Sequence, residues 1–362
     1  MTWRPTSPYN DLPDLPPRVD IETKPVLKAA IEARAALASL DQAAKRMTNP
    51  AVLINSIPLL EAQASSEIEN IVTTADDLFK FAQAESAATN PATKETLKYR
   101  TALFAGITLI QTRPLSSMTA AQVCTIVKGR EMDVRRLAGT YIGNPATQAA
   151  IYTPPSGESL IRDKLGNWEN FLHQRGNLDP LVAMAVAHYQ FEAIHPFEDG
   201  NGRTGRIMNI LMLINSGLIE QPILYFSRYI IEKKDEYYRL LLEVTRDGDW
   251  EEWILFMLEG IRKTALSTVA KIDQIQALQG ETLRKIRGAT SAANADLLAV
   301  LFEQPYCRIA NVVERCRVSR PTATNWLNAL VQEGVLVDVK SGRERIFINS
   351  RFFQLLMRPD IA

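Results

Sequence analysis

One segment of this chain is apolar on almost every side when it is wound into a helix. Residues 179–194 read DPLVAMAVAHYQFEAI, which leaves such a helix with almost no polar face to turn toward water. A helix of this kind needs other elements on every side. The segment therefore predicts a central buried helix, which the 362 residues of the chain are long enough to enclose.

Helical periodicity dominates the flanking sequence as well. Further helices are expected at residues 24–44, 49–71, 94–110 and 119–129. The exception is residues 139–155, where two short strand-like pieces flank Gly143, Asn144 and Pro145. The pattern predicts a mainly α fold that carries one β-hairpin.

The C-terminal third has a different element order. Residues 262–288 have the composition of a polar connecting helix, and residues 295–349 favour three helices followed by a hairpin, which is the order of a winged helix. Four parts are expected: an N-terminal helical segment at 1–110, a core at 111–262, a connecting helix at 263–290 and a winged helix at 291–362.

Composition excludes several classes of protein. Equal numbers of basic and acidic residues, 41 each, argue against a globally basic nucleic-acid binder. No run approaches the roughly 18 consecutive apolar residues of a membrane helix, and the polar, proline-rich start is unlike a signal peptide. The three cysteines have no CxxC spacing for zinc or thiol redox chemistry. We therefore expect a cytoplasmic protein with reduced cysteines and no membrane partner.

The string HPFEDGNGRTGR, residues 195–206, follows the central helix directly. Its part GNGRTG matches GxGxxG, but a dinucleotide-binding fingerprint requires a preceding strand and an acidic residue about 20 positions later. Here a helix precedes the string, and the Walker pattern GxxxxGK[ST] is absent. What remains is a glycine turn whose backbone N–H groups can bind an anion at the start of the next helix.

The charged residues of this loop favour one kind of ligand. Arg203 and Arg206 lie in the first turn of the next helix, where cations are unfavourable unless an anion such as a polyphosphate binds. Asp199 would repel phosphates unless a hard cation such as Mg²⁺ bridges them. His195 has an ordinary pKa of about 6.5 and can accept a proton from a hydroxyl. We expect Phe197 to anchor the loop in the core.

The string resembles the Fic-domain signature HPFx[DN]GNGRxGR at every defined position. The resemblance implies a helical fold and the transfer of AMP from ATP to a hydroxyl (Tyr, Thr or Ser) of a protein. It implies His195 as the general base and Asp199 as the Mg²⁺ ligand. The nucleotide-binding residues that it implies are Gly200, Asn201 and Gly202 for the α and β phosphates, Arg203 and Arg206 for the β and γ phosphates, with Thr204 and Gly205 between them, and Tyr238 for the nucleotide pocket. Tyr237 is the alternative to Tyr238, and core packing is the alternative for both.

A second match concerns regulation. Residues 65–70, SSEIEN, fit the family's inhibitory pattern [ST]xxxE[GN], and Ser65 and Glu69 lie one helical turn apart. A Glu69 carboxylate that pairs bidentately with Arg206 would take the guanidinium meant for the γ phosphate. On its own, Glu69 would be interpreted as a solvated carboxylate.

The predicted hairpin indicates where a target protein could bind. An exposed edge at residues 140–153 can hold an extended segment of a target protein, or of the chain itself, and covering the core is the structural alternative. His188 is interpreted as a hydrogen-bonded core histidine and His173 as a surface residue. Two other functions stay open: transfer of another nucleotide-derived group, and a nucleotide-sensing DNA-binding regulator.

The DNA hypothesis rests on the last part of the chain. Its third helix offers polar side chains to a major groove and the hairpin adds basic ones: Arg320, Thr322, Thr324, Asn325, Lys340, Arg343 and Arg345. Glu333, Asp338 and Glu344 lie among them and oppose phosphate contact. Winged helices also mediate dimerisation, so a homodimer is the other expectation for this part.

Overall fold

The computed structural model describes residues 3–358 apart from 48, 83–86, 144–146, 148, 175, 291–294 and 342–343. Helices form most of the described chain, which confirms the mainly α fold class. The helices are α1 (Lys24–Lys45), α2 (Ala51–Ile68), α3 (Ala75–Phe81), α4 (Pro91–Ile110), α5 (Ser117–Lys128), α6 (Glu158–His173), α7 (Pro180–Ile194), α8 (Asn201–Asn215), α9 (Phe226–Glu232), α10 (Lys234–Asp247), α11 (Trp250–Ala289), α12 (Ala295–Glu303), α13 (Ile309–Cys316), α14 (Arg320–Gln332) and α15 (Ser350–Met357). The strands are β1 (Ile142–Gly143), β2 (Ala150–Tyr152), β3 (Tyr306–Arg308), β4 (Val337–Ser341) and β5 (Glu344–Ile348).

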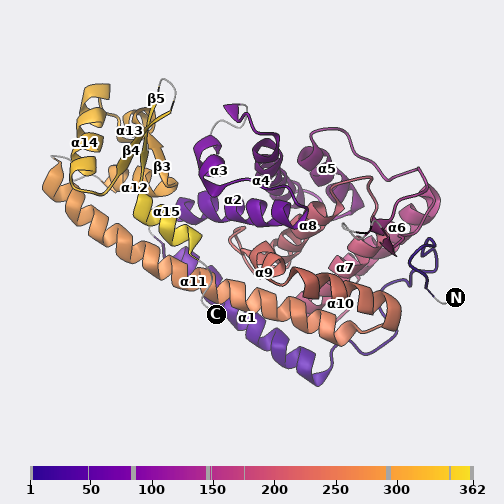
Figure 1. Ribbon diagram of the computed structural model, residues 1–362. Coiled ribbons are helices and arrows are strands. Elements are labelled where there is room, and N and C mark those ends of the chain that lie inside the picture. The colour runs from indigo at the N-terminus through magenta and orange to yellow at the C-terminus, as the bar shows by residue number, and fades with distance from the viewer. Residues whose placement is uncertain are drawn as a thin grey trace.

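Helix α7 is the predicted central buried helix. Asp179 caps its N-terminus, and every residue from 181 to 194 is buried except Glu192. The indole N–H of Trp168 on α6 donates to the carbonyl of Ala187, and that of Trp253 on α11 donates to the carbonyl of Ala185. Helix α8 packs on α7 as well. The surrounding helices therefore fix the end of α7, where the loop with the motif begins (Figure 1).

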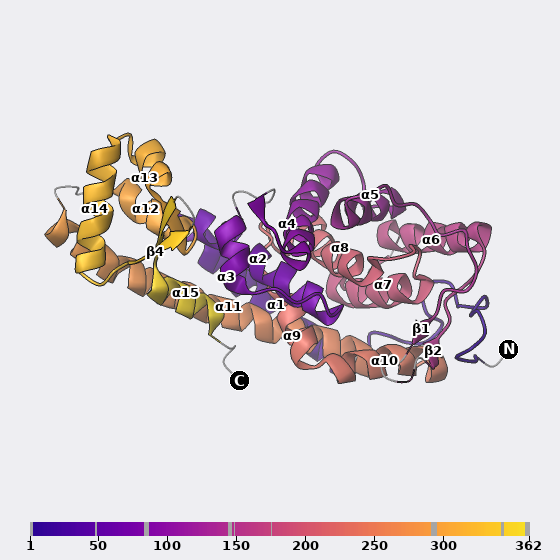
Figure 2. The ribbon, with the colours of Figure 1, turned by 45° about the horizontal axis from the view of Figure 1, so that its top comes forward.

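Helix α11 runs without a break through the boundary predicted at 262/263. It packs along α1, and the two helices lie side by side in Figures 1 and 2. Gly260 allows this packing to extend to α9, because a Cβ there would collide with the rings of Phe226 and Tyr229. The C-terminal half of α11 reaches α14 and α15, so one helix connects the region of the motif with the last part of the chain.

The predicted hairpin is present as strands β1 and β2, which pair antiparallel with Ile142 opposite Tyr152. The turn formers Asn144 and Pro145 lie outside the described residues, and Gly143 ends β1. Tyr152 fixes the base of the hairpin to α7 through a hydrogen bond from its hydroxyl to the Ala193 carbonyl. The N-terminal segment joins there too, since the Tyr9 N–H donates to the Thr153 carbonyl.

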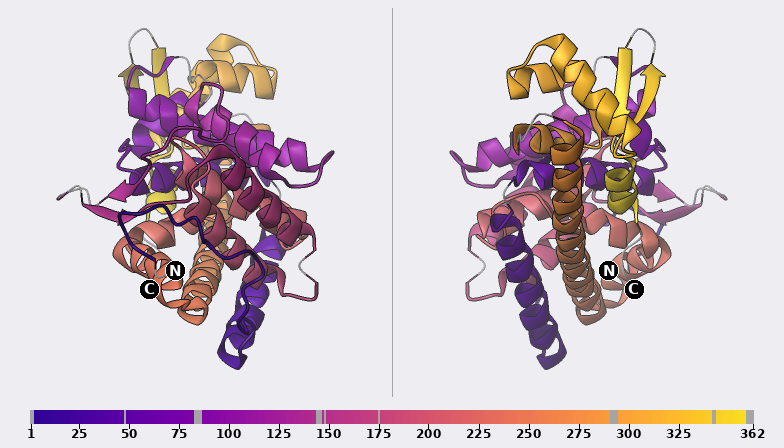
Figure 3. Two further views of the ribbon diagram at one scale, coloured as in Figure 1. Left: turned by 90° about the vertical axis from the view of Figure 1, so that its right-hand side faces the viewer. Right: turned by 90° about the vertical axis from the view of Figure 1, so that its left-hand side faces the viewer.

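The last part of the chain forms a compact body at one end of the molecule (Figures 1 and 3). Its order is α12, β3, α13, α14, β4, β5 and α15, with the strands arranged β3-β5-β4. The three helices and the hairpin follow the predicted order, while β3 and α15 were not predicted. This body packs against α3, where Phe79 stacks on Tyr306 and meets Phe353 edge-on.

None of the helices in the described ranges is both long and apolar enough to cross a membrane. Cys124, Cys307 and Cys316 are buried and form no disulfide.

Candidate active site

The loop between α7 and α8 is shaped by its own side chains. His195 ends α7 in the left-handed conformation, with φ 48° and ψ 61°, and Gly200 precedes α8 with φ 84°. The Asn201 amide bonds the Phe197 backbone in both directions, with Oδ1 accepting from the N–H and Nδ2 donating to the carbonyl at 2.8 Å each. Phe197 is only 1% exposed, so the loop is anchored in the core as predicted. The Asn201 side chain is thus used within the loop, which leaves its backbone N–H for an anion.

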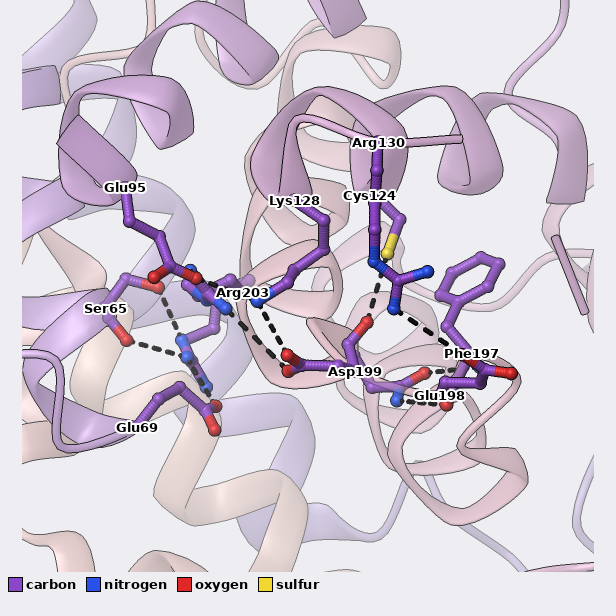
Figure 4. A network of polar contacts seen from close by, with 12 residues as sticks. Ser65, Glu69, Glu95, Cys124, Lys128, Arg130, Phe197, Glu198, Asp199 and Arg203 are labelled. Carbon is purple, nitrogen blue, oxygen red and sulfur yellow. Dashed lines mark hydrogen bonds and ion pairs between the residues drawn. The ribbon is translucent and has the colours of Figure 1, made fainter. Parts of the chain in front are cut away.

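The N-terminus of α8 holds an anionic group of the protein itself. The Glu69 carboxylate lies over Gly202, where a Cβ would collide with Oε1. Arg206 Nη2 donates to the same oxygen at 2.9 Å. A helix N-terminus and a buried arginine both attract negative charge. The Glu69 carboxylate therefore lies in surroundings that favour negative charge (Figure 4).

Arg206 divides its hydrogen bonds between Ser65 on α2 and Glu69, the C-cap residue of that helix. Its Nε donates to Ser65 Oγ at 2.8 Å, and its Nη2 donates both to the Ser65 carbonyl at 2.8 Å and to Glu69. The predicted bidentate pairing with Glu69 is thus replaced by one contact, because Ser65 takes the other side of the guanidinium. The Arg206 side chain is 1% exposed.

Electrostatics hold this contact in its charged form. Burial acts to raise the pKa of Glu69, but the Arg206 guanidinium outweighs it and the pKa lies below its ordinary value. Burial acts to lower the pKa of Arg206, and Glu69 reverses this as well. The two side chains are therefore a charged pair at neutral pH.

Sequence reasoning missed a third polar residue on the same face of α2. Glu61 is buried and accepts a hydrogen bond from the Ser227 N–H at 2.9 Å, one from the Ser227 hydroxyl and one from the Tyr99 hydroxyl at 3.3 Å. Burial raises the pKa of Glu61 to about 7. Its spacing of four residues from Ser65, in an otherwise apolar stretch, is the signal that could have identified it.

Arg203 and Asp199 belong to a second charged network (Figure 4). Arg203 Nη1 contacts Glu95 Oε1 at 2.8 Å, and Lys128 Nζ contacts that oxygen at 2.9 Å and Asp199 Oδ2 at 2.6 Å. Burial acts to raise the pKa of Asp199, but Lys128 and Arg203 hold it below its ordinary value. Glu95 and Lys128 lie on α4 and α5, outside the motif, and no local pattern points to them.

The surroundings of His195 keep its imidazole uncharged. Burial, together with the nearby charge of Arg135, lowers the pKa of its imidazole to about 4, so the ring is neutral near pH 7. Arg135 fixes the backbone on the other side, since its Nε donates to the His195 carbonyl at 2.8 Å and its Nη2 donates to the Pro155 carbonyl. One buried guanidinium thus joins the motif loop to the segment after the hairpin.

A cavity of about 440 Å³ lies beside Glu69. The end of α2, the hairpin, α7 and α10 line it, and Tyr238 contributes from α10. Tyr237 points into the core instead, where its hydroxyl lies 2.9 Å from His188 Nε2. This contact confirms His188 as a hydrogen-bonded core histidine, and His173 is exposed as expected. Of the two tyrosines, Tyr238 is therefore the one beside the site.

The remaining positions of the motif serve packing between α8 and its neighbours. Thr204 is buried beside the Cys124 thiol. A Cβ on Gly205 would collide with Glu192 Oε1, so this glycine lets α8 approach α7. Burial raises the pKa of Glu192, which also lines the cavity, to about 7.

The loop carries two carboxylates, Glu198, which pairs with Arg130 at 3.5 Å, and Asp199. In the described ranges no three His, Cys, Asp or Glu side chains form a cluster that could hold a metal ion. Asp199 is 56% exposed, and its carboxylate already has the Lys128 ammonium as a neighbouring cation. One carboxylate combined with phosphate oxygens suits Mg²⁺, which keeps several waters and binds few protein ligands.

The fold and the site define a helical protein with a neutral histidine beside an anion site at a helix N-terminus. Three family models match the chain: Fic/DOC family N-terminal at residues 27–108, Fic/DOC family at 117–213, and Protein adenylyltransferase SoFic-like, C-terminal domain, at 278–352. The chain belongs to the Fic/DOC family.

Curated relatives share part of this sequence. Protein adenylyltransferase Fic of Drosophila melanogaster is 30% identical over 154 residues, which are 40% of this chain and 30% of that protein. The protein of the same name from Drosophila grimshawi is 30% identical over 110 residues, 30% of this chain and 21% of that protein. The chain thus spans between a fifth and a third of the length of these relatives.

Solved structures share the fold. A Fic family protein from Desulfovibrio desulfuricans aligns with a TM-score of 0.58 and 21% identity, over 92% of this chain and 98% of that chain. Fic-1 from C. elegans aligns with a TM-score of 0.52 and 20% identity, over 67% of this chain and 73% of that chain.

Proposed function

We propose that this protein is a protein adenylyltransferase, which transfers AMP from ATP to a tyrosine, threonine or serine hydroxyl of a protein and releases pyrophosphate. The observation that carries the proposal is the Glu69 carboxylate, which lies on Arg206 and over Gly202 beside a neutral His195. The position of this carboxylate indicates an anion-binding site, formed by Arg206 and Gly202, next to His195 as the base. The curated relatives, which are named protein adenylyltransferase Fic, support the same activity.

The proposed reaction is one displacement at the α phosphorus. His195 accepts the proton of the target hydroxyl, whose oxygen forms a bond to the α phosphorus. The bond from this phosphorus to the oxygen bridging the α and β phosphates breaks, and that oxygen leaves with pyrophosphate. The backbone N–H groups of residues 200–202 bind the α and β phosphates, while Arg203 and Arg206 bind the β and γ phosphates.

Asp199 is the residue that would hold Mg²⁺ in this proposal. The half-exposed carboxylate and the oxygen ligands of a bound nucleotide suit this ion. When bound, the ion would neutralise charge on the phosphates.

Glu69 makes the enzyme auto-inhibited in this proposal. The γ phosphate and Glu69 require the same side of Arg206, so ATP can bind productively only after Glu69 has left. ATP that binds while Glu69 stays in place is held in an unproductive pose.

The hairpin at 140–153 is the proposed docking site for the target protein. It borders the cavity beside Glu69, and a short exposed strand can pair with an extended segment through main-chain hydrogen bonds. The chain itself is the alternative target, in cis or within a homodimer.

The four predicted parts and the cytoplasmic location stay predictions, and so does the winged-helix interpretation of residues 291–362. A nucleotide-sensing DNA-binding regulator is the second candidate function, because α14 is preceded by α13 and followed by a hairpin. Arg345 is engaged by Asp338 at 2.8 Å, which leaves less positive charge for DNA phosphates, and Arg343 lies outside the described residues.

Labelled ATP tests the proposed activity. The Glu69→Gly protein is incubated with lysate and with ATP labelled on the α or on the γ phosphate, beside Glu69→Gly combined with His195→Ala. Label from the α phosphate should enter protein with Glu69→Gly and not with Glu69→Gly combined with His195→Ala. Retention of γ label, or equal labelling by the His195→Ala protein, would overturn the proposal.

A further inference from the structure

The Lys128 ammonium pairs with the Asp199 carboxylate in this structure. Its Nζ lies 2.6 Å from Asp199 Oδ2 and 2.9 Å from Glu95 Oε1, and the side chain is 15% exposed (Figure 4). The same Glu95 oxygen contacts Arg203. Positive and negative groups thus alternate from Arg203 through Glu95 and Lys128 to Asp199, and Arg203 Nη2 itself lies 3.9 Å from Asp199 Oδ1.

The aliphatic part of the Lys128 side chain also lies against Gly200. A Cβ on Gly200 would lie 3.2 Å from Lys128 Cδ and 3.3 Å from its Cγ. The side chain therefore crosses one of the glycines whose N–H groups would face a phosphate. Lys128 is the last residue of α5, where the helix dipole alone stabilises a lysine. Stabilising α5 requires no contact with Asp199.

A metal ion and the ammonium would compete for the same carboxylate, that of Asp199. A metal ion and the Lys128 ammonium on one carboxylate would repel each other strongly, because the site is partly buried. Lysine is a point charge on a flexible four-carbon stem, so its ammonium can move while its backbone stays in place. Glu95, already in contact with Nζ, offers an anion to which the ammonium can move.

We propose that Lys128 is an internal counterion of Asp199. When the metal–nucleotide complex binds to Asp199, the ammonium leaves this carboxylate and stays paired with Glu95. Lys128 and Glu95 are positioning residues that set the metal affinity of Asp199 in opposite directions. The inference rests on the proposed function, because it takes Asp199 as the metal ligand. Without Lys128 the carboxylate keeps, among the described residues, the longer 3.9 Å ion pair with Arg203 and is more accessible to the metal. Without Glu95 the ammonium pairs with Asp199 alone among the described residues.

Calorimetry with ADP and Mn²⁺ tests the proposal without catalysis. ADP lacks the γ phosphate that Glu69 would exclude, so the full-length protein can be used without an activating substitution. The measured quantity is the metal effect, defined as the Kd of ADP in EDTA divided by its Kd with saturating Mn²⁺. This ratio removes any change in nucleotide affinity that does not depend on the metal.

The two variants should change the metal effect in opposite directions. Lys128→Met should raise it about three- to tenfold, the range of a partly buried ion pair, and Glu95→Gln should lower it by a similar factor. Lys128→Arg keeps the charge and should stay near the wild-type value. Lys128→Gln also removes the charge and should raise the metal effect, so it serves as the second variant should Lys128→Met fail to fold.

A neighbouring ion pair provides matched controls for through-space electrostatics. Arg130 and Glu198 lie 3.5 Å apart in the same region, and in the described part of the chain neither side chain forms an ion pair or hydrogen bond with the Asp199 carboxylate (Figure 4). Arg130→Met and Glu198→Gln should leave the metal effect unchanged. Changes as large as those at Lys128 and Glu95 would show a general charge effect and overturn the proposal.

Asp199→Asn separates this inference from the proposed function. If it abolishes the metal effect while Lys128→Met leaves that effect at the wild-type value or lower, the counterion proposal alone is wrong. If the metal effect survives Asp199→Asn in full, the metal-ligand assignment fails, and the inference built on it fails too.

Discussion

Replacing Glu69 by glycine should raise transfer activity and lower stability at the same time. The substitution removes one charge-assisted hydrogen bond, from Arg206 Nη2 at 2.9 Å. Such bonds contribute about 1.5–3 kcal/mol. The Glu69 side chain is 35% exposed, and solvent screening reduces the contribution to about 1–2 kcal/mol. If a γ phosphate must displace this contact, AMP transfer at subsaturating ATP should rise about 5- to 30-fold.

The free energy of unfolding should fall in the same variant, by about 1–2 kcal/mol, because Arg206 then keeps Ser65 as its one hydrogen-bond partner among the described residues. Initial rates of AMP incorporation and thermal unfolding are measured on one preparation. Glu67→Gly is the matched control: this exposed carboxylate lies two residues away, so the glycine destabilises the end of α2 without freeing Arg206.

The sign of the activity change decides the outcome. A folded Glu69→Gly protein that is no faster than wild type would refute the reasoning, and so would an equal gain in Glu67→Gly. Glu69→Gly combined with Arg206→Ala should be inactive, because the freed guanidinium is the group that the nucleotide needs.

Four further outcomes are expected. His195→Ala in the activated background should lose transfer while nucleotide affinity by calorimetry stays within about twofold, because the imidazole holds no phosphate. The acid limb of kcat/KM against pH should lie well below 6.5, since the pKa of His195 is lowered to about 4 and removing the Glu69 charge lowers it further; an inflection near 6.5 would contradict the buried neutral base. Asp199→Ala should lose the metal-dependent activity, and an unchanged Mg²⁺ requirement would point to another ligand. Glu192→Gln should gain stability relative to wild type as pH rises from about 4.5 to 7, because the pKa of this carboxyl is raised to about 7 and wild type loses stability over that window; denaturant unfolding at pH 5 and pH 8 measures the difference.

Local sequence was sufficient for the elements that are specified by their own residues. The apolar pattern at 181–194 required burial on every side, and the packing of Trp168 and Trp253 on α7 supplies it. The loop could be predicted for the same reason, since its glycines and charged residues are contiguous. Ser65 and Glu69 are also linked by local spacing, and the structure brings both to Arg206.

Contacts between distant helices could not be predicted. Glu95 and Lys128 lie on separate helices, and only the packing of α4, α5 and α8 places them beside Asp199 and Arg203. The sharing of the Arg206 guanidinium between Ser65 and Glu69 was missed, because it depends on the Ser65 backbone carbonyl, which no side-chain pattern reveals. The continuity of α11 was missed too, because its polar composition after residue 262 resembles a linker although α1 covers one face of it.

Intact-mass spectrometry of the modified protein tests the central claim most directly. The labelled band from the reaction of Glu69→Gly with ATP is purified, weighed and fragmented. The account predicts a gain equal to one AMP group on a tyrosine, threonine or serine hydroxyl, absent with His195→Ala. A gain equal to a phosphate alone or to another nucleotide, or an AMP group on a side chain without a hydroxyl, would contradict it.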